Sequence, residues 1–278
     1  MEELDLCENF WLGESLTTFP KLGKLLKLDL SSCNLRQLPN GLEDCFDLQA
    51  LDLQGNSMLA NKPINIGNLK NLEKLDLSSC GSKQLPIGLE ECCELEELNL
   101  HDNPGLGKSS ISIPTLGNLK KLNLSWCGLD QLPVGLERCF ELQELNLYNN
   151  QMRIDASIII PKLVNLVELN FSLCGLTQFR SGLGQCCQLQ TLSFSHNPML
   201  ANNSIYIPKL EQLKELDLSS CKLQQLPSGL NECLELQNLY VGGNNLGESV
   251  LTVVGLPKLT TLVYNNHIFN RGEGGKIY

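Results

Sequence analysis

Leucines recur along the chain in the pattern L-x-x-L-x-L, and after two further residues each copy ends in Asn or Cys. Leu25, Leu28 and Leu30 before Cys33 give one such copy. The Leu-x-Leu core has the period of two that places alternate side chains on one face of a β-strand. The pattern therefore predicts a short strand in every copy, with its leucines buried on one face.

The residue that closes each copy alternates without exception between Asn and Cys. We call this series the structural ladder: Asn9, Cys33, Asn56, Cys80, Asn103, Cys127, Asn150, Cys174, Asn197, Cys221 and Asn244. Successive Cys are 47 residues apart, and so are successive Asn, so the unit is a doublet of copies. A degenerate twelfth copy ends at His267. We predict one elongated repeat domain of about twelve copies over residues 1–267, followed by a Gly-rich tail over 268–278.

Two kinds of return segment join the copies. The Cys-type copies are followed by L-x-Q-L-P-x-G-L-E-x-C, as in 35–45 and 129–139. The Asn-type copies are followed by longer segments that end in I-x-I-P or a related sequence, as in 111–114 and 205–208. These motifs resemble the leucine-rich repeat family over nearly the whole chain. The alternation is similar to ribonuclease-inhibitor-type repeats, and the L-P-x-G-L returns are more similar to intracellular repeats of Roco GTPase proteins.

The resemblance implies an α/β solenoid of the horseshoe type. Its parallel strands would line a concave face, with short helices, turns or extended segments on the convex side. In the family, the ladder Asn bonds to backbone groups of neighbouring loops. A Cys donates or accepts only weakly, so the Cys layers are expected to pack more by shape.

Ten of the 13 cysteines occupy two fixed repeat positions, the ladder and the series Cys45, Cys92, Cys139, Cys186 and Cys233. This regularity favours buried, reduced thiols over a disulfide framework. The first residues form a repeat strand instead of an apolar signal segment, and we expect a cytoplasmic protein. The array begins inside a repeat and shows no specialised caps, which suggests a fragment or a chain that stacks end to end.

The formal net charge is −10. It disfavours a nucleic-acid ligand, because phosphate binding needs a basic stripe, and it is compatible with a basic protein partner. The three histidines fall in separate repeats, and no C-x-x-C pair occurs. No nucleophile, base and oxyanion donor come together. We therefore predict no enzyme activity, no cofactor, no metal site and no membrane span.

Candidate binding residues are those that break the repeat pattern at exposed positions. With the first leucine of a copy as position one, positions three, five, seven and eight face solvent on the predicted concave face. Position five is a polar series that includes Asp5, Asp29, Asp52 and Asp76, followed by Asn99, Asn123, Asn146 and Asn170. These side chains would either contact a ligand or bond to one another along the sheet.

Positions seven and eight are Ser-Ser in three Cys-type copies, but the central copies carry larger side chains. The predicted partner-binding residues are His101, Asp102, Trp126, Tyr148, Leu173 and His196, together with Asn99, Asn123, Asn146 and Asn170. Trp, Tyr and His among polar residues have the composition of a binding hot spot. The alternative is that Trp126 and Leu173 fold inward over the loop edge and fill gaps.

Three functions fit these observations. We favour a non-enzymatic module that binds a protein or peptide on its concave face, a role shared with signalling and immune scaffolds of the same fold class. A structural solenoid that assembles through its ends or its convex face is the second. An extracellular recognition receptor is the third, for which disulfides and occupied glycosylation sequons would be expected.

Overall fold

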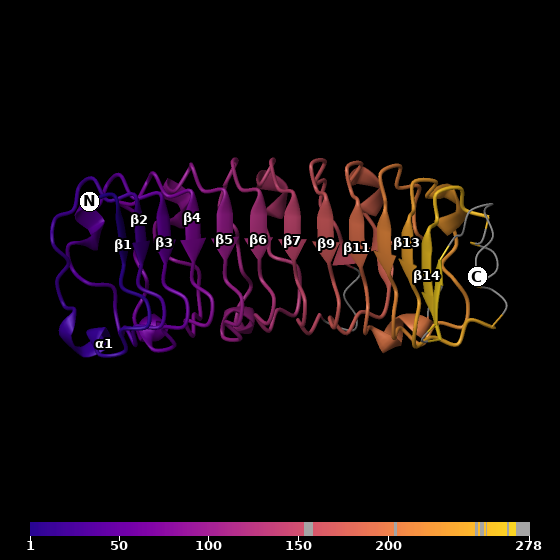
Figure 1. Cartoon of the computed structure of the whole chain (residues 1–278), viewed down its shortest axis with the longest axis horizontal. Helices are drawn as coiled ribbons and strands as arrows, with labels where there is room; N and C mark the ends of the chain where they lie inside the picture. Colours follow the sequence, from indigo (N-terminus) through magenta and orange to yellow (C-terminus); the bar gives the residue numbers. More distant parts are fainter. Residues whose placement is uncertain are drawn as a thin grey trace. The chain divides into compact units, whose positions relative to one another are not determined.

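A short β-strand forms at each predicted Leu-x-Leu core (Figure 1). The computed structural model describes residues 1–152, 158–202, 205–247, 250, 253, 255–265 and 267–270. The chain divides into two units. Unit 1 comprises Met1–Leu129 and Pro133–Leu142, and unit 2 comprises Asp130–Leu132 and Gln143–Tyr278. Each unit is a stack of the repeats that the sequence predicts.

Unit 1 holds six strands that pair in parallel in the order of the sequence. They are β1 (Glu3–Asp5), β2 (Lys27–Asp29), β3 (Ala50–Asp52), β4 (Lys74–Asp76), β5 (Glu97–Asn99) and β6 (Lys121–Asn123). Its helices are α1 (Leu12–Ser15) and the 3-10 turns η1 (Leu42–Asp44), η2 (Leu59–Asn61), η3 (Leu89–Glu91), η4 (Leu106–Lys108) and η5 (Leu136–Arg138).

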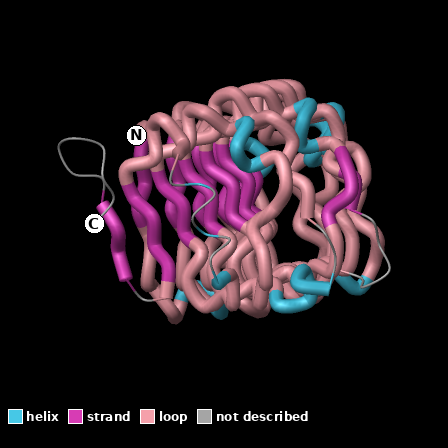
Figure 2. The backbone as a smooth tube through the Cα atoms, turned by 90° about the vertical axis from the view of Figure 1, so that its right-hand side faces the viewer, coloured by secondary structure: helices cyan, strands magenta, loops and turns pink. Residues whose placement is uncertain are grey.

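Unit 2 continues the same design with β7 (Glu144–Asn146), β9 (Glu168–Asn170), β11 (Thr191–Ser193), β12 (Glu215–Asp217), β13 (Asn238–Tyr240) and β14 (Thr261–Tyr264), which are parallel neighbours. Its 3-10 turns are η6 (Leu183–Gln185), η7 (Pro198–Asn202) and η8 (Leu230–Glu232). β8 (Ile158–Ile159) pairs with β10 (Phe179–Ser181) on the side of the coil opposite the main strands (Figure 2).

The strands are in register, so identical repeat positions stack. Leu28 of β2 lies between Leu4 and Leu51 of its two neighbours. The leucines at positions one, four and six of this copy, Leu25, Leu28 and Leu30, are at most 2% exposed. Fully burying one leucine contributes about 1.5–3 kcal/mol. The core of each unit is therefore a column of leucine layers, and the predicted solenoid fold class is confirmed.

The return segment of each Asn-type copy pairs with the return segment of the following Cys-type copy. This pairing explains why the repeating unit is a doublet of copies. Within each doublet the I-x-I segment forms a parallel bridge with the following L-P-x-G segment, for example Asn65 with Ile87 and Ser112 with Val134. Val134 N–H donates to Ile111 O, and Ile113 N–H donates to Val134 O. Two successive copies therefore share one set of backbone bonds on the side away from the main sheet.

The glycine of each L-P-x-G segment is required by this pairing. Gly135 has φ +91°, and a Cβ placed there would lie 2.2 Å from Ile113 O. We expect Gly135→Ala to lower the free energy of unfolding by about 1–3 kcal/mol, from the strained backbone and the forced separation of the two segments. Chemical denaturation would measure the loss.

Gly117 provides the matched control in unit 1. No heavy atom lies within 4 Å of a Cβ at this glycine, so Gly117→Ala should change stability little. Equal losses in Gly135→Ala and Gly117→Ala would contradict the role given to the close approach at Gly135.

The last described strand differs from the others. β15 (His267–Asn270) pairs antiparallel with β14, with Phe269 opposite Leu262. The sheet of unit 2 thus extends to Asn270, past the predicted boundary at 267. Among the described residues, no helix has the length and apolar character needed to cross a membrane.

Candidate partner-binding surface

The ladder asparagines tie successive turns together. Asn56 is fully buried, and its Oδ1 accepts the N–H groups of Cys33 and Leu35 at 3.1 and 2.8 Å. Its Nδ2 donates to Leu30 O and Leu53 O. Asn197 and Asn244 repeat this pattern. The amide suits the position because it both accepts and donates.

The ladder cysteines form hydrogen bonds as well, which adds a polar contact to the layers that were expected to pack more by shape. The Sγ atoms of Cys33, Cys80, Cys127, Cys174 and Cys221 lie 3.0–3.1 Å from the carbonyl oxygen at position six of the preceding copy. The thiol therefore replaces one donor bond of the amide. All 13 cysteines of the chain lie among the described residues and are free of disulfides. The cytoplasmic location stays a prediction.

The two kinds of turn explain why Asn and Cys alternate. In an Asn-type turn the chain bonds to itself, as where Leu59 N–H donates to Asn56 O at 2.8 Å. In a Cys-type turn the residue after the Cys has positive φ, as at Asn34 and Gly81, and two N–H groups turn toward the next copy. The copy after a Cys-type turn therefore needs an acceptor and has Asn. The copy after an Asn-type turn needs only a donor and has Cys.

The position-five residues shape the strand ends. Nine of them accept the backbone N–H two residues later at 2.8–3.1 Å: Asp5, Asp29, Asp52, Asp76, Asn99, Asn123, Asn146, Asn170 and Asp217. This is the side-chain turn that Asn and Asp favour. Burial raises the pKa of the Asp52 carboxyl, and the negative charges of Asp76 and Asp29 raise it further. The hydrogen bond from Gln54 N–H lowers this pKa, but by less. The four predicted binding asparagines thus have a structural role in addition to any contact they make.

Position eight adopts left-handed backbone geometry in all eleven complete copies. Its occupants are Glu8, Ser32, Gly55, Ser79, Asp102, Trp126, Asn149, Leu173, His196, Ser220 and Gly243. This geometry suits Gly, Asn and Asp and is unfavourable for bulky side chains. Trp126 and Leu173 are nevertheless 47% and 37% exposed, and His196 is exposed. The alternative that Trp126 and Leu173 fold inward therefore does not describe their placement.

Unit 1 holds Asn99, His101, Asp102, Asn123 and Trp126 of the predicted surface. Ser125 Oγ–H donates to Asn123 Oδ1 at 2.6 Å, and His101 Nδ1 lies 2.8 Å from Ser125 Oγ. Because the hydroxyl hydrogen is already donated to Asn123, His101 Nδ1–H donates to Ser125 Oγ.

Asp102 is anchored in the same unit. Its Oδ2 accepts from Ser79 Oγ at 2.9 Å. The backbone N–H of Asp102 donates to Ser125 O, also at 2.9 Å. These bonds hold the polar side chains beside Trp126 in fixed orientations.

Unit 2 holds Asn146, Tyr148, Asn170, Leu173 and His196. Tyr148 N–H donates to Asn146 Oδ1 at 3.0 Å, and Tyr148 is half-buried. Asn170 Oδ1 accepts from Ser172 Oγ, which also lies 2.7 Å from Ser193 Oγ. The sequence therefore identifies one set of bulky, exposed side chains in each unit.

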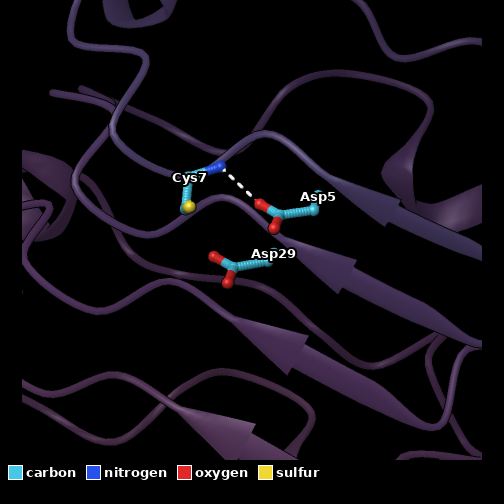
Figure 3. Close-up of side chains that lie close together, drawn as sticks. All are labelled: Asp5, Cys7 and Asp29. Carbon is cyan, nitrogen blue, oxygen red and sulfur yellow. Dashed lines mark hydrogen bonds between the residues drawn. The ribbon is translucent and has the colours of Figure 1, made fainter.

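A further cluster, which the sequence did not single out, lies at the first strands. Asp5, Cys7 and Asp29 place one carboxylate oxygen or sulfur atom each within 4.8 Å of one another (Figure 3). The Asp5 side chain raises the pKa of the Cys7 thiol to about 11, and the Cys7 N–H bond lowers the pKa of Asp5. The thiol is therefore protonated at neutral pH. A Cys two residues after a position-five Asp was the available sequence signal.

Comparisons with known proteins agree with this geometry. The family pattern described as Leucine Rich Repeat matches residues 24–45, 118–139 and 212–233. A comparison with curated protein sequences gave no significant match.

Several solved structures share the fold. A leucine-rich repeat protein of Leptospira interrogans is 24% identical with a TM-score of 0.51, over 95% of this chain and 89% of that one. The functional domain of InlJ from Listeria monocytogenes, which includes a cysteine ladder, is 18% identical with a TM-score of 0.56, over 90% and 56%.

The plant peptide hormone receptor RGFR1, solved in complex with RGF2, is 24% identical with a TM-score of 0.54, over 89% of this chain and 41% of that one. This chain thus spans less than half of the receptor chain. The matched repeats, the in-register parallel strands and the Asn/Cys ladder show that the chain contains leucine-rich repeats and has the leucine-rich repeat fold.

Proposed function

We propose that the protein is a non-enzymatic interaction module that binds a protein or peptide partner on the solvent-facing side of its strands, the sheet face. The observation that carries this proposal is the occupancy of position eight. Gly, Asn and Asp fill the left-handed site without strain in some copies, whereas Trp126 and Leu173 fill it in others.

The backbone strain at Trp126 and Leu173 favours a role for these side chains in binding a partner over a role in stabilising the fold. A left-handed conformation costs a bulky residue about 1–2 kcal/mol, and such strain is found most often at functional sites. Trp126 and Leu173 are too exposed to recover this energy in the core. Contact with a partner would bury both, and a tryptophan is among the residues that contribute most to interfaces.

Proteins of related fold support a protein or peptide as the class of partner. One neighbour is a peptide hormone receptor solved in a complex, and leucine-rich repeat proteins typically act as interaction modules. A rigid array lowers the ordering cost of binding, because its surface is formed before the partner arrives. We further propose that the partner is basic, since exposed Asp102 lies one copy before Trp126.

A substitution at position eight tests the proposal. We expect Trp126→Gly to change the free energy of unfolding by less than about 1 kcal/mol, because relief of strain offsets lost contacts. We expect the same variant to lose most of a partner that the unaltered protein retains from a cell lysate. Quantitative affinity capture with mass spectrometry and urea denaturation would measure the two effects.

Ser32→Gly is the matched control, because it makes the same backbone change at the same repeat position without removing a large side chain. It should retain the partner. Equal recovery of every captured protein by the unaltered chain, Trp126→Gly and Ser32→Gly would contradict a binding role for this surface.

A further inference from the structure

An apolar stripe lies on unit 1, in the segments that follow the 3-10 turns η1, η3 and η5. Directly after the buried Cys of each Cys-type return comes an exposed apolar residue, and in unit 1 these are Phe46, Cys93 and Phe140. Phe46 and Phe140 are 56% and 63% exposed. We call Phe46, Cys93 and Phe140 the lateral stripe.

The three residues project from equivalent backbone sites. Each follows a 3-10 turn whose closing Cys has nearly the same geometry, with φ and ψ of −87° and 65° at Cys45, −84° and 65° at Cys92, and −90° and 76° at Cys139. Asn71 Nδ2 donates to Phe46 O at 2.8 Å, and Asn118 Nδ2 donates to Cys93 O at 3.1 Å. The backbone of the stripe is therefore held to the next copy.

Exposed acidic residues accompany the stripe on both sides in the sequence. Glu43, Glu90 and Glu137 precede its three residues, and Asp47, Glu94 and Glu141 follow them. Within the described residues, only Glu137 of these six has a basic side chain at ion-pair distance, Arg138 at 4.0 Å. Lys21 and Lys70 pair instead with Asp44 and Glu91. We call these six carboxylates the acidic rails.

Unit 2 lacks this combination. The corresponding apolar positions are Cys187 and Leu234, but Gly184, Gln188 and Asn231 occupy three of the four rail positions. The fourth is Glu235, which is paired with Lys258. An apolar stripe between exposed carboxylates, five of which have no basic side chain at ion-pair distance among the described residues, is therefore a property of unit 1 and not of the repeat in general.

The spacing of the stripe matches a helix. Successive stripe residues are two strands apart, or about 9.6 Å at the usual strand spacing, and seven residues of an α-helix rise about 10.5 Å. A helix lying along the stripe would place apolar residues i, i+7 and i+14 over Phe46, Cys93 and Phe140. Basic residues beside this row would meet the acidic rails, as in other complexes of amphipathic helices.

We propose that unit 1 binds a basic amphipathic α-helix of a protein partner along the lateral stripe. This surface shares no residue with the predicted binding residues of the sheet face, so the test of one proposal does not decide the other. The apolar row supplies the buried area, and the rails supply orientation and charge selectivity. The carboxylates also disfavour an anionic membrane surface as the occupant.

The experiment is a titration of the full chain with a synthetic helical peptide of about 22 residues. The peptide has leucine at i, i+7 and i+14 with lysine on both flanks, and a second peptide has glutamate in place of lysine. Fluorescence anisotropy should show saturable binding of the lysine peptide only. The double variants Phe46→Ser with Phe140→Ser, and Glu90→Lys with Glu94→Lys, should each weaken it at least about tenfold.

Leu234→Ser, the same repeat position in unit 2, should leave the affinity unchanged, and circular dichroism would verify that all variants fold. Equal affinity of the lysine peptide for the unaltered chain and the phenylalanine double variant would indicate nonspecific electrostatic attraction and would overturn the proposal. The absence of saturable binding would overturn it as well. A concentration-dependent dimer in sedimentation that the phenylalanine variant abolishes would assign the stripe to a second copy of the chain, and would also overturn it.

Discussion

Raising the pH from about 8 to about 11 is expected to unfold the protein through its buried thiols. Burial raises the pKa of Cys80, Cys127 and Cys174 to about 12, and that of Cys92, Cys139, Cys186 and Cys221 to about 11. The ordinary thiol value is 9.0. The folded chain therefore keeps these protons over a pH range in which the unfolded chain has released them.

The direction of the effect follows from proton linkage. Because the folded pKa is raised, the thiols' contribution to stability is fully present below about pH 9 and is lost as the pH rises toward the folded values. Each thiol lowers the free energy of unfolding by about 1.4 kcal/mol per pH unit in this window. Seven such thiols reach the size of a whole domain's stability, about 5–15 kcal/mol, within little more than one unit.

Urea denaturation at several pH values between about 8 and 10, in the presence of a reductant, would measure the slope. The triple variant Cys80→Ser, Cys127→Ser, Cys174→Ser should have a slope smaller by about 4 kcal/mol per pH unit, because serine does not ionise in this range. An identical slope in the triple variant would show that these thiols do not control alkaline unfolding.

Replacing a buried ladder asparagine with cysteine is expected to lower the free energy of unfolding by about 2–6 kcal/mol. This loss is expected even though cysteine is the natural ladder residue of the next copy. Asn197 Oδ1 accepts the N–H groups of Cys174 and Leu176, both at 3.0 Å. A thiol at this position would still donate to Phe171 O, but it would leave both N–H groups buried without an acceptor. Each such group costs about 1–3 kcal/mol.

Asn9→Cys is the matched control. Asn9 is exposed, its Nδ2 donates to Leu6 O and Cys7 O, and no backbone N–H among the described residues donates to its Oδ1. This substitution should therefore cost less than about 1 kcal/mol. Thermal and urea unfolding of Asn197→Cys, Asn9→Cys and the unaltered chain would compare them. Similar stability of the two variants would contradict the account of the Asn/Cys alternation given by the turns.

The repeat pattern predicted the strands well because the signal is local and repeated. A leucine at every second position is a direct consequence of one buried face, and Leu28, Leu51 and Leu75 confirm it by their burial and register. The bulky residues Trp126 and Leu173 were also identified correctly as exposed departures from the pattern. Their possible contact with a partner stays a prediction.

Other features were outside the reach of the pattern. The left-handed geometry of position eight was not apparent in the sequence, since only two of its eleven occupants are glycine and Ser, Trp and Leu occupy it as well. The expectation for the cysteines was incomplete, because the sulfur bonds of Cys80 and Cys174 depend on a carbonyl of the preceding copy. The sequence did not identify the lateral stripe, because Phe46 and Phe140 directly follow a buried Cys and could not be distinguished from the buried apolar residues around it.

The sequence by itself determined the number of copies, their doublet period, the strand positions and the leucine core, because each depends on neighbours within one copy. Tertiary structure decided which backbone N–H groups of a turn face the next copy, which return segments pair, and which apolar side chains point to solvent. These properties arise only when one copy stacks on another. Asn56 shows the difference. The sequence reveals that Asn occupies every second ladder position, but only the stacked turn supplies the two N–H groups that require the oxygen of Asn56.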